Sequence, residues 1–347
     1  MGESFAVKIL SRTLCQAALC LCVGCTEQEQ KRIESTPEEW LKTNEVDAVC
    51  RRIADLNVQV VTIGEGISPA MINLMRAIAD RYRVNIPEDA FIRNTTKNAV
   101  FIDTKEKRLA HFLKATQSDF RFIWCMRGGF GTNMLIDDLN RMPIPEVKKT
   151  LIGFCDITSM HLFVHQKWGW RAIHAPLFVF LAKTLFSRDK FSTLLNILEG
   201  KIDHYELRNV QPLNEVARRA SQVTGPLTGG NLTVVEASLG TCWEIETEDR
   251  IVFLEDVHTY PQWIYRSMYH LKESGKLSKI KALLFGEFIQ PENSYQDVVS
   301  YLRKFAETLV DVPVYVTNQF GHGRCCMPLI YGAPAQIHAG KMTVWVK

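Results

Sequence analysis

Cys155 stands in a segment whose residue types and spacing suit a nucleophile. Residues 151–158 read Leu-Ile-Gly-Phe-Cys-Asp-Ile-Thr, and a helical pattern of apolar residues follows. This is the strand–turn–helix order of a nucleophile elbow, in which the reactive side chain lies at the apex of a tight turn. A helix N-terminus beyond the turn would stabilise a thiolate or a developing oxyanion. A buried core cysteine is the alternative interpretation, because Ile157 replaces the second glycine of the Gly-x-Ser-x-Gly form.

Two later segments offer an acid and a base. Glu255 and Asp256 end an apolar strand-like run, and His322 lies between two glycines just after the predicted strand 312–316. Histidine is the usual general base, and a carboxylate can fix its tautomer and stabilise its cation. The chain order Cys155, Glu255, His322 therefore predicts a catalytic triad. Taken singly, each carboxylate also suits a solvated strand end or a helix cap, and the histidine also suits a structural turn.

A glycine-rich loop follows the predicted strand 120–125. Residues 127–132 read Arg-Gly-Gly-Phe-Gly-Thr and lead into a helical pattern. Glycines allow backbone N–H groups to point into a cavity, which suits a phosphate or an oxyanion. No Gly-Lys-Ser/Thr follows and the Gly-x-Gly-x-x-Gly spacing is absent, so nucleotide binding is weakly supported. An oxyanion loop beside Cys155 fits better, with a plain tight turn as the alternative.

Five motifs occur in the order and approximate spacing of the LD-carboxypeptidases. They are Arg-Gly-Gly-Phe-Gly, Ile-Gly-Phe-Cys-Asp-Ile-Thr, Gly-Gly-Asn-Leu, Phe-Leu-Glu-Asp-Val and Phe-Gly-His-Gly. The chain resembles this serine peptidase family, which includes murein tetrapeptide carboxypeptidase and the microcin C immunity peptidase, over roughly residues 58–340. The resemblance implies a Ser–Glu–His triad. Its serine falls on Cys155, its glutamate on Glu255 and its histidine on His322.

The same resemblance implies the rest of the site. The family's oxyanion hole falls near Gly128 and Gly129 and on the backbone N–H of Asp156, and we place Asn231 of the Gly-Gly-Asn-Leu motif among the substrate-binding residues. It also implies release of a terminal D-alanine from an L,D bond of murein tetrapeptide, a muropeptide or other small peptide as substrate, no metal or organic cofactor, and a homodimer. His174 lies close enough to the nucleophile in sequence to line the cleft.

The chain departs from the family pattern in places that bear on activity. Cys155 replaces the family's serine, and a site shaped for a hydroxyl accommodates the larger sulfur poorly. Near the substrate rim, the chain has Trp263 and Tyr265 and keeps only Arg266. Two other functions therefore stay open: a peptidase on another amide, as in the microcin immunity branch, and a catalytically silent protein that binds peptidoglycan peptides.

Strand–helix alternation predicts an α/β fold with a doubly wound parallel sheet and its site at the strand C-termini. We expect a leader and helical extension, an N-terminal nucleophile domain with the elbow, a helical linker, and a β-rich C-terminal domain that carries Glu255 and His322. Their expected bounds are 1–57, 58–178, 179–213 and 214–347. Within them we expect strands at 58–63, 120–125 and 150–154 and helices at 158–167 and 177–199. The site is then expected in the cleft between the two domains.

Composition agrees with an enzyme that has a large core. The chain has 347 residues, 46% of them hydrophobic, and a net charge of +3. The basic residues form no stripe, so nucleic acid is not an expected partner. The cysteines include no Cys-x-x-Cys pair with histidine partners, so zinc is not expected.

The first residues allow two interpretations. Lys8 and Arg12 precede a short apolar run that ends at Cys25, which is typical of a lipoprotein signal but too short to span a membrane. An amphipathic or disordered extension fits as well. The relative that acts on recycled murein fragments is cytoplasmic, so we expect a cytoplasmic protein, with a membrane-anchored lipoprotein as the alternative.

Overall fold

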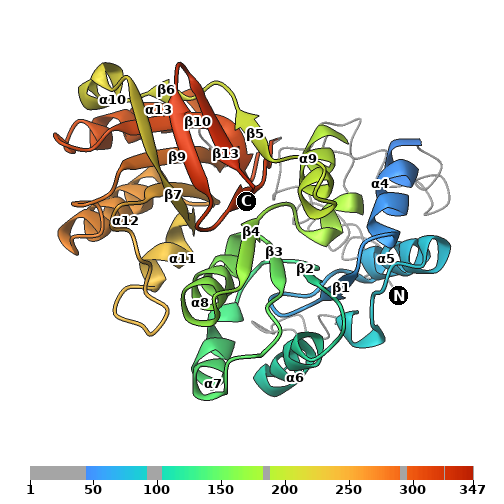
Figure 1. The fold of residues 1–347 in the computed structure, drawn as a ribbon. Coiled ribbons are helices and arrows are strands. Elements are labelled where there is room, and N and C mark those ends of the chain that lie inside the picture. The colour runs from blue at the N-terminus through green and yellow to red at the C-terminus, as the bar shows by residue number, and fades with distance from the viewer. Residues whose placement is uncertain (1–43, 92–103, 183–187, 290–294, 324, 347) are drawn as a thin grey trace, which may run out of the picture.

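The computed structural model describes most of the chain. The described residues are 44–91, 104–182, 188–289, 295–323 and 325–346. The predicted leader, Cys25 and the start of the predicted N-terminal helix lie outside them. Two sheets, each covered by helices, form the described part (Figure 1).

The first sheet has the strand order β1-β2-β3-β4-β11, and its first four strands are parallel. Nearly every residue of these four strands is buried, as expected for a parallel sheet with both faces covered. The short strand β11 pairs antiparallel with β4. The bounds are β1 Val58–Val61, β2 Phe122–Cys125, β3 Thr150–Gly153, β4 Arg171–His174 and β11 Leu329–Ile330.

Helices α6, α7 and α8 lie on one side of this sheet, and α4 and α9 lie on the other (Figure 1). Ser68 and Thr104 cap α5 and α6, because each side chain accepts a backbone N–H of the first turn. The bounds are α4 Asn44–Ala54, α5 Pro69–Tyr82, η1 Glu88–Ala90, α6 Lys105–Thr116, η2 Thr132–Leu135, α7 Ile136–Arg141, η3 Cys155–Ile157, α8 Thr158–Trp168, η4 Phe178–Ala182 and α9 Arg188–Leu198. The predicted alternation of strand and helix is confirmed.

The second sheet has the strand order β5-β13-β12-β7-β8-β9-β10-β6. Strands β7, β8, β9 and β10 are parallel, and antiparallel strands flank them. The β-rich C-terminal domain is therefore confirmed. The bounds are β5 His204–Leu207, β6 Gln211–Pro212, α10 Glu215–Arg219, β7 Gln222–Asn231, α11 Leu232–Ala237, β8 Ile251–Val257, α12 Pro261–Glu273, β9 Ala282–Ile289, α13 Tyr295–Ala306, β10 Val314–Gly321, β12 Pro334–His338 and β13 Lys341–Trp345.

Three short strands differ from the expected segmentation. The segment 179–213, expected to be a helical linker, contains β5 and β6, which form the two edges of the second sheet. Strand β11 follows the second sheet's β10 in sequence but joins the first sheet. A strand of two to four residues is too short to show a periodic pattern of apolar residues. Its conformation is therefore decided by pairing with strands elsewhere in the chain.

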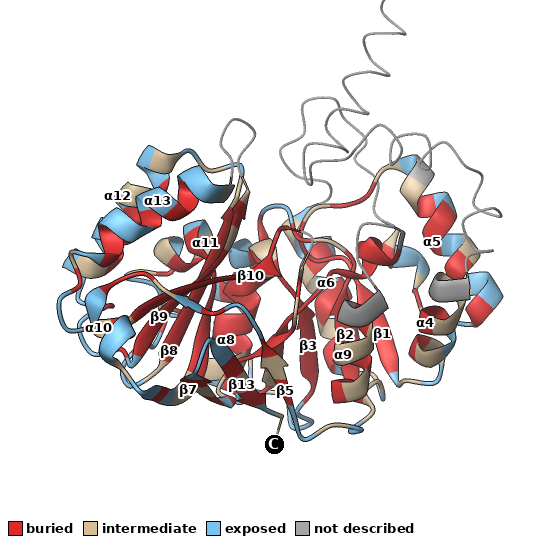
Figure 2. Cartoon of the chain, turned by 90° about the horizontal axis from the view of Figure 1, so that it is seen from above, coloured by how far each residue is buried: buried red, intermediate tan, exposed pale blue. Residues whose placement is uncertain are grey.

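Burial follows the sheets (Figure 2). The strands are largely buried, whereas α12 and α13 keep an exposed face. Among the described helices, none is both long and apolar enough to cross a membrane.

Candidate active site

The predicted elbow is present between β3 and α8. Cys155 follows the end of β3 and adopts φ of 63°, a left-handed conformation that is unusual for a residue with a side chain. Such strain persists only where the surroundings impose it, and it concentrates at functional sites. Gly153 makes the turn possible, since a Cβ there would lie 3.1 Å from Ile157 and 3.2 Å from the Cβ of Cys125. The cysteine side chain is partly exposed, unlike its neighbours.

His322 and Glu255 meet beside this elbow. The imidazole donates from Nδ1 to Oε2 of Glu255 over 2.5 Å, and both side chains are buried. The charge of Cys155 also acts on this imidazole, whose ring lies 4.5 Å from the ring of Phe154. The structure therefore brings together the three residues that the sequence nominated, from β3, β8 and the end of β10.

Local irregularities of the second sheet place the histidine. The pairing of β9 with β10 shifts between Val316 and Gly321, and the pairing of β8 with β9 shifts next to Glu255. Bulges of this kind redirect side chains and are common next to active sites. Gly321 has φ of 114°, and a Cβ there would lie 2.7 Å from the carbonyl oxygen of Glu287. A glycine is therefore required just before His322.

Charge stabilises the acid–base pair. Burial alone would lower the pKa of His322, but the charges of Glu255 and Cys155 and its hydrogen bonds to both raise that pKa well above its usual value. Burial would raise the pKa of Glu255, and the adjacent imidazolium outweighs this, so the carboxyl pKa is lowered. Both directions describe an ion pair in which the imidazole carries a proton near neutral pH.

The glycine loop packs directly against the nucleophile. A Cβ on Gly128 would lie 3.0 Å from the Cβ of Cys155 and 3.1 Å from the carbonyl oxygen of Phe154. The carbonyl oxygen of Gly128 accepts the backbone N–H of Glu65 over 2.8 Å. That contact turns the N–H of the same peptide unit, which belongs to Gly129, to the opposite side.

Asp156 ties this loop to the elbow. Its carboxylate accepts the backbone N–H of Thr132 over 2.9 Å, and its carbonyl oxygen accepts the Thr132 hydroxyl over 2.7 Å. Burial raises the pKa of this carboxyl, and the bonds to Thr132 act in the opposite direction. The side chain of Asp156 is thus structural, and only its backbone N–H remains a candidate for substrate contact.

Glu65 and Arg127 form a polar rim beside the loop. Their side chains pair over 3.0 Å, and Arg127 also donates to the carbonyl oxygen of Gly66 over 2.7 Å. Glu65 occupies the space that a side chain on Gly129 would need. The two glycines of the loop therefore serve different needs: Gly128 admits the nucleophile and Gly129 admits Glu65.

We expect Gly128→Ala to lower kcat by about 10²-fold, because a displacement of about 1 Å at the reacting groups costs that much. The added methyl group would press on Cys155 and on the carbonyl oxygen of Phe154. Steady-state kinetics on a cleaved peptide measure the loss. Gly275→Ala is the matched control, since it strains a backbone at φ of 79° but meets no atom within 4 Å. Equal kcat in both variants would contradict the close packing.

Asn231 lies behind the carboxylates. Its Nδ2 donates to Asp256 over 2.9 Å, and its Oδ1 accepts the backbone N–H of Val234 at the start of α11. Its own backbone N–H donates to the hydroxyl of Thr158 in the nucleophile helix. The side chain is buried, so the contacts of Asn231 join β7, β8 and α8. Asn231, expected among the substrate-binding residues, thus ties the strand that carries Glu255 to the nucleophile helix.

His174, expected to line the cleft, is fully buried at the end of β4. Its ring packs 5.5 Å from Phe154 and 5.4 Å from Phe253, so it lies behind the triad. At the surface, the guanidinium of Arg266 lies 4.6 Å from the centre of the exposed Trp263 ring. Sequence reasoning did not find Glu65 or the buried partners of the triad, because no local motif marks them.

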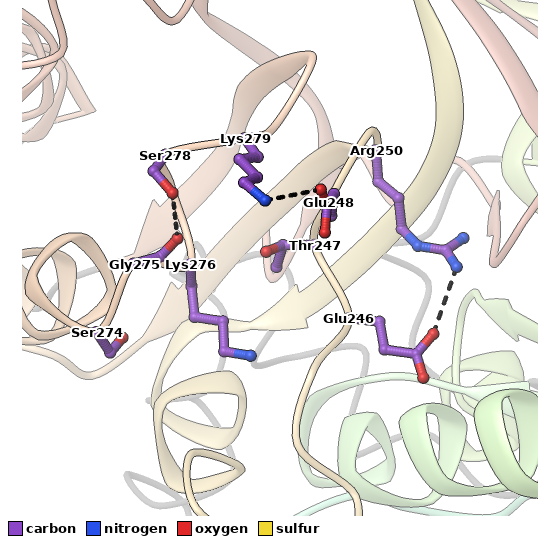
Figure 3. Close-up of a pocket in the computed structure, with 9 residues that line it drawn as sticks. All are labelled: Glu246, Thr247, Glu248, Arg250, Ser274, Gly275, Lys276, Ser278 and Lys279. Carbon is purple, nitrogen blue, oxygen red and sulfur yellow. Dashed lines mark hydrogen bonds and ion pairs between the residues drawn. The ribbon is translucent and has the colours of Figure 1, made fainter.

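A separate pocket lies at the opposite end of the second sheet (Figure 3). Its volume is about 500 Å³, and its residues precede β8 and β9 rather than follow them. The charges that line it largely neutralise one another, as Lys279 pairs with Glu248 over 3.0 Å and Arg250 with Glu246 over 3.5 Å. Ligand sites of parallel sheets lie at the strand C-termini, so this pocket is not the candidate site. Within the described ranges, no three His, Cys, Asp or Glu side chains are grouped to hold a metal ion.

Two family domains match this chain along its length. The LD-carboxypeptidase N-terminal domain matches residues 58–175, and the LD-carboxypeptidase C-terminal domain matches residues 224–337. The first contains the elbow and the glycine loop, and the second contains the acid and the base.

Curated relatives agree with this match. A putative carboxypeptidase of Rickettsia conorii is 41% identical over 219 residues, which is 63% of this chain and 68% of the relative. The murein tetrapeptide carboxypeptidase of Pseudomonas aeruginosa is 29% identical over 251 residues, which is 69% of this chain and 80% of the relative.

Solved structures share the fold. The muramoyltetrapeptide carboxypeptidase of Oxalobacter formigenes superposes with a TM-score of 0.65 at 21% identity, covering 83% of this chain and 97% of that one. The microcin C7 self-immunity protein MccF, in its wild-type apo state, superposes with a TM-score of 0.65 at 15% identity over 83% and 95% of the two chains. With both family domains matched in order and a relative above 40% identity, the chain belongs to the LD-carboxypeptidase family.

Proposed function

We propose that this carboxypeptidase releases the terminal D-alanine of murein tetrapeptide, with Cys155 as nucleophile, His322 as acid and base, and Glu255 as the residue that orients and stabilises the imidazolium. One observation carries the proposal. Cys155 lies at the strained apex of the elbow, and its charge acts on an imidazole whose Nδ1 donates to a buried carboxylate. Nucleophile, base and orienting acid need that connectivity.

The reaction then runs through a thioester. The sulfur of Cys155 attacks the carbonyl carbon of the terminal peptide bond, and the protonated His322 gives its proton to the departing amine of D-alanine. A water molecule next gives a proton to the neutral imidazole and attacks the thioester. The C–S bond then breaks, the shortened peptide leaves as its acid, and the sulfur is again an anion beside the protonated His322. Glu255 favours each step in which His322 is charged, because its carboxylate accepts the Nδ1 proton.

The oxyanion of each tetrahedral intermediate would be held by backbone N–H groups at Gly129 and Asp156. Gly128 lies against the nucleophile, and the contact of its carbonyl with Glu65 sets the orientation of the loop. Asp156 is held by Thr132. Hydrogen-bond donors that are already held in position need no reorganisation during the reaction, and this is why an oxyanion hole stabilises the transition state.

Incubation with murein tetrapeptide, followed by mass detection of free alanine, tests the proposed function. We expect release from the free acid and none from the same peptide with a C-terminal amide, because a carboxypeptidase recognises the terminal carboxylate. Release from neither would contradict the proposed activity.

Two other functions have an observation in their favour. The fold is shared with the microcin C7 self-immunity protein, which favours cleavage of another amide. Cysteine in place of the family's serine favours a silent protein that binds peptidoglycan peptides. Cleavage of an aminoacyl sulfamoyl nucleoside would support the first, and tight binding of tetrapeptide without turnover would support the second.

We expect the pKa of His322 to be lower in Cys155→Ala than in the wild-type protein. The charge of Cys155 and its hydrogen bond are among the causes that raise this pKa, so their removal takes away part of the stabilisation of the imidazolium. An NMR titration of the imidazole Cε1–H, assigned with His322→Gln, measures the difference. An unchanged pKa would show that sulfur and imidazole do not interact.

We further propose a homodimer and a cytoplasmic location, both by analogy with the family. Light scattering of the purified protein tests the first, and a mass of one chain would refute it. For the second, intact Met1 recovered from the soluble fraction is expected. Partition into detergent that is lost in Cys25→Ser would show the lipoprotein alternative instead.

A further inference from the structure

A group of buried polar side chains behind the triad has no role in the mechanism described so far. It consists of His174 on β4, His161 on α8 and the second carboxylate oxygen of Glu255, Oε1, on β8. All three residues are fully buried. Neither ring nitrogen of either histidine, nor Oε1 of Glu255, has a hydrogen-bond partner among the residues that the structure describes.

Aromatic contacts place these groups around one buried region. The ring of Phe154 lies 4.5 Å from His322 and 5.5 Å from His174, so it packs against both imidazoles. Phe253 lies 5.4 Å from His174 and 5.5 Å from Tyr331, which in turn lies 5.1 Å from His161.

Electrostatic interactions agree with this arrangement. The charge of Glu255 acts on the pKa of His174, and His174 acts on the pKa of both Glu255 and His161. Burial lowers the pKa of His174 to about 4, so its ring is neutral near pH 7. A neutral imidazole offers one donor and one acceptor, whereas a carboxylate oxygen only accepts.

Buried polar atoms in folded proteins nearly always have a partner, from the protein or from an ordered water. A buried water requires two to four polar neighbours, and Oε1 of Glu255 and the ring of His174 are two unpartnered ones. A metal ion is a poorer occupant, because the described residues contain no metal-holding group. The nearby His165 does not belong to the set, since its Nδ1 bonds the carbonyl oxygen of Trp170 over 3.2 Å.

We propose that an ordered buried water joins Oε1 of Glu255 to the imidazole of His174, and that His174 is thereby a positioning residue for Glu255. With Oε1 held from behind, Oε2 stays directed at Nδ1 of His322. Outer hydrogen bonds of this kind orient the groups that act directly. The kinetic consequence rests on the proposed function, whereas the hydration site does not.

Two variants of His174 test the positioning role. His174→Phe keeps a flat ring but removes both nitrogens, and we expect a fall of about 10-fold or more in kcat with KM within about twofold, because the effect acts through orientation. His174→Gln keeps a donor and an acceptor and should recover most of the loss. His165→Phe is the matched control: it breaks one histidine hydrogen bond outside the set and should lower thermal stability without lowering kcat.

Two readouts do not depend on peptidase activity. The first is the rate at which iodoacetamide modifies Cys155, which should fall in His174→Phe and recover in His174→Gln. The second is a high-resolution crystal structure of the wild-type protein, which should show a water within about 2.6–3.2 Å of Oε1 of Glu255 and of a ring nitrogen of His174. No such water, or a His174→Phe variant modified at the wild-type rate, would overturn the proposal. Failure to cleave tetrapeptide alone would refute only the proposed function.

Discussion

Replacement of Cys155 by alanine is expected to lower kcat on murein tetrapeptide by about 10⁴- to 10⁶-fold, the loss seen when a catalytic nucleophile is removed from a triad. A residual rate from the oxyanion loop and from binding should remain. Cys242→Ser is the matched control, because Cys242 is an exposed free cysteine. If Cys155→Ala retained wild-type activity, the nucleophile would lie elsewhere.

Replacement of Cys155 by serine is the more informative change. The elbow backbone and the glycine loop do not depend on the sulfur atom, and a lower pKa of His322 without it suits a general base, so we expect the serine variant to retain or gain activity on an L,D-peptide. Its hydroxyl must give up its proton during attack, since it carries no charge beforehand. If the wild-type protein and this variant both bind tetrapeptide but cleave nothing, the silent binding protein is the correct function.

Iodoacetamide gives a test of the same residue without a substrate. A thiol beside an imidazolium and a helix N-terminus reacts faster than an ordinary one. Modification near pH 7 should therefore favour Cys155 over the other cysteines, and His322→Ala should slow it. Mass spectrometry of the digested protein measures the rate at each site. Modification of Cys242 before Cys155 would contradict an activated nucleophile.

Glu255→Gln is expected to lower kcat by about 10³- to 10⁴-fold, as does loss of the triad carboxylate in other hydrolases. The amide keeps the shape but carries no charge to stabilise the imidazolium. Asp256→Asn is the matched control on the adjacent residue. Asp256 accepts hydrogen bonds from Asn231, from Thr233 and from the N–H of Val257. The Asp256→Asn variant should therefore have a free energy of unfolding lower by about 1–3 kcal/mol, with a smaller effect on kcat.

The same pair makes stability depend on pH. The pKa of Glu255 is lower in the folded than in the unfolded protein. Its carboxylate therefore stabilises the fold above the unfolded pKa of about 4.3, and this stabilisation is lost as pH falls through the folded pKa. The pKa of His322 is higher in the folded than in the unfolded protein. Its imidazolium therefore stabilises the fold fully below the unfolded pKa of about 6.5, and this stabilisation is lost as pH rises through the folded pKa. Glu255→Gln should therefore be most destabilising between about pH 4.3 and 6.5. Urea unfolding of the wild-type protein and of Glu255→Gln at pH 5.5 and 9 measures the loss of free energy of unfolding. An equal loss at both pH values would contradict the ion pair.

The local pattern predicted the first sheet closely. Strands β1, β2 and β3 were expected within two residues of their observed bounds, and so was α8, expected at 158–167 and observed at Thr158–Trp168. Apolar periodicity, glycines and caps act within one segment, so the sequence displays them. The predicted helix at 177–199 appears as η4 and α9, with residues 183–187 outside the described part. Strand β4 of the first sheet and the edge strands β5, β6 and β11 depend on partners elsewhere in the chain and were not predicted.

The sequence by itself determined the family, the two-domain α/β architecture and the candidates for chemistry, because motifs such as the glycine loop impose local backbone geometry. Only the tertiary structure decided which groups meet. Successive residues of a strand point to opposite faces, so Glu255 reaches His322 while Asp256 reaches Asn231. Burial likewise placed His174 behind the triad instead of in the cleft. Contacts between separate strands set these outcomes, 67 residues apart for Glu255 and His322 and 25 apart for Asn231 and Asp256, and no spacing within one segment encodes them.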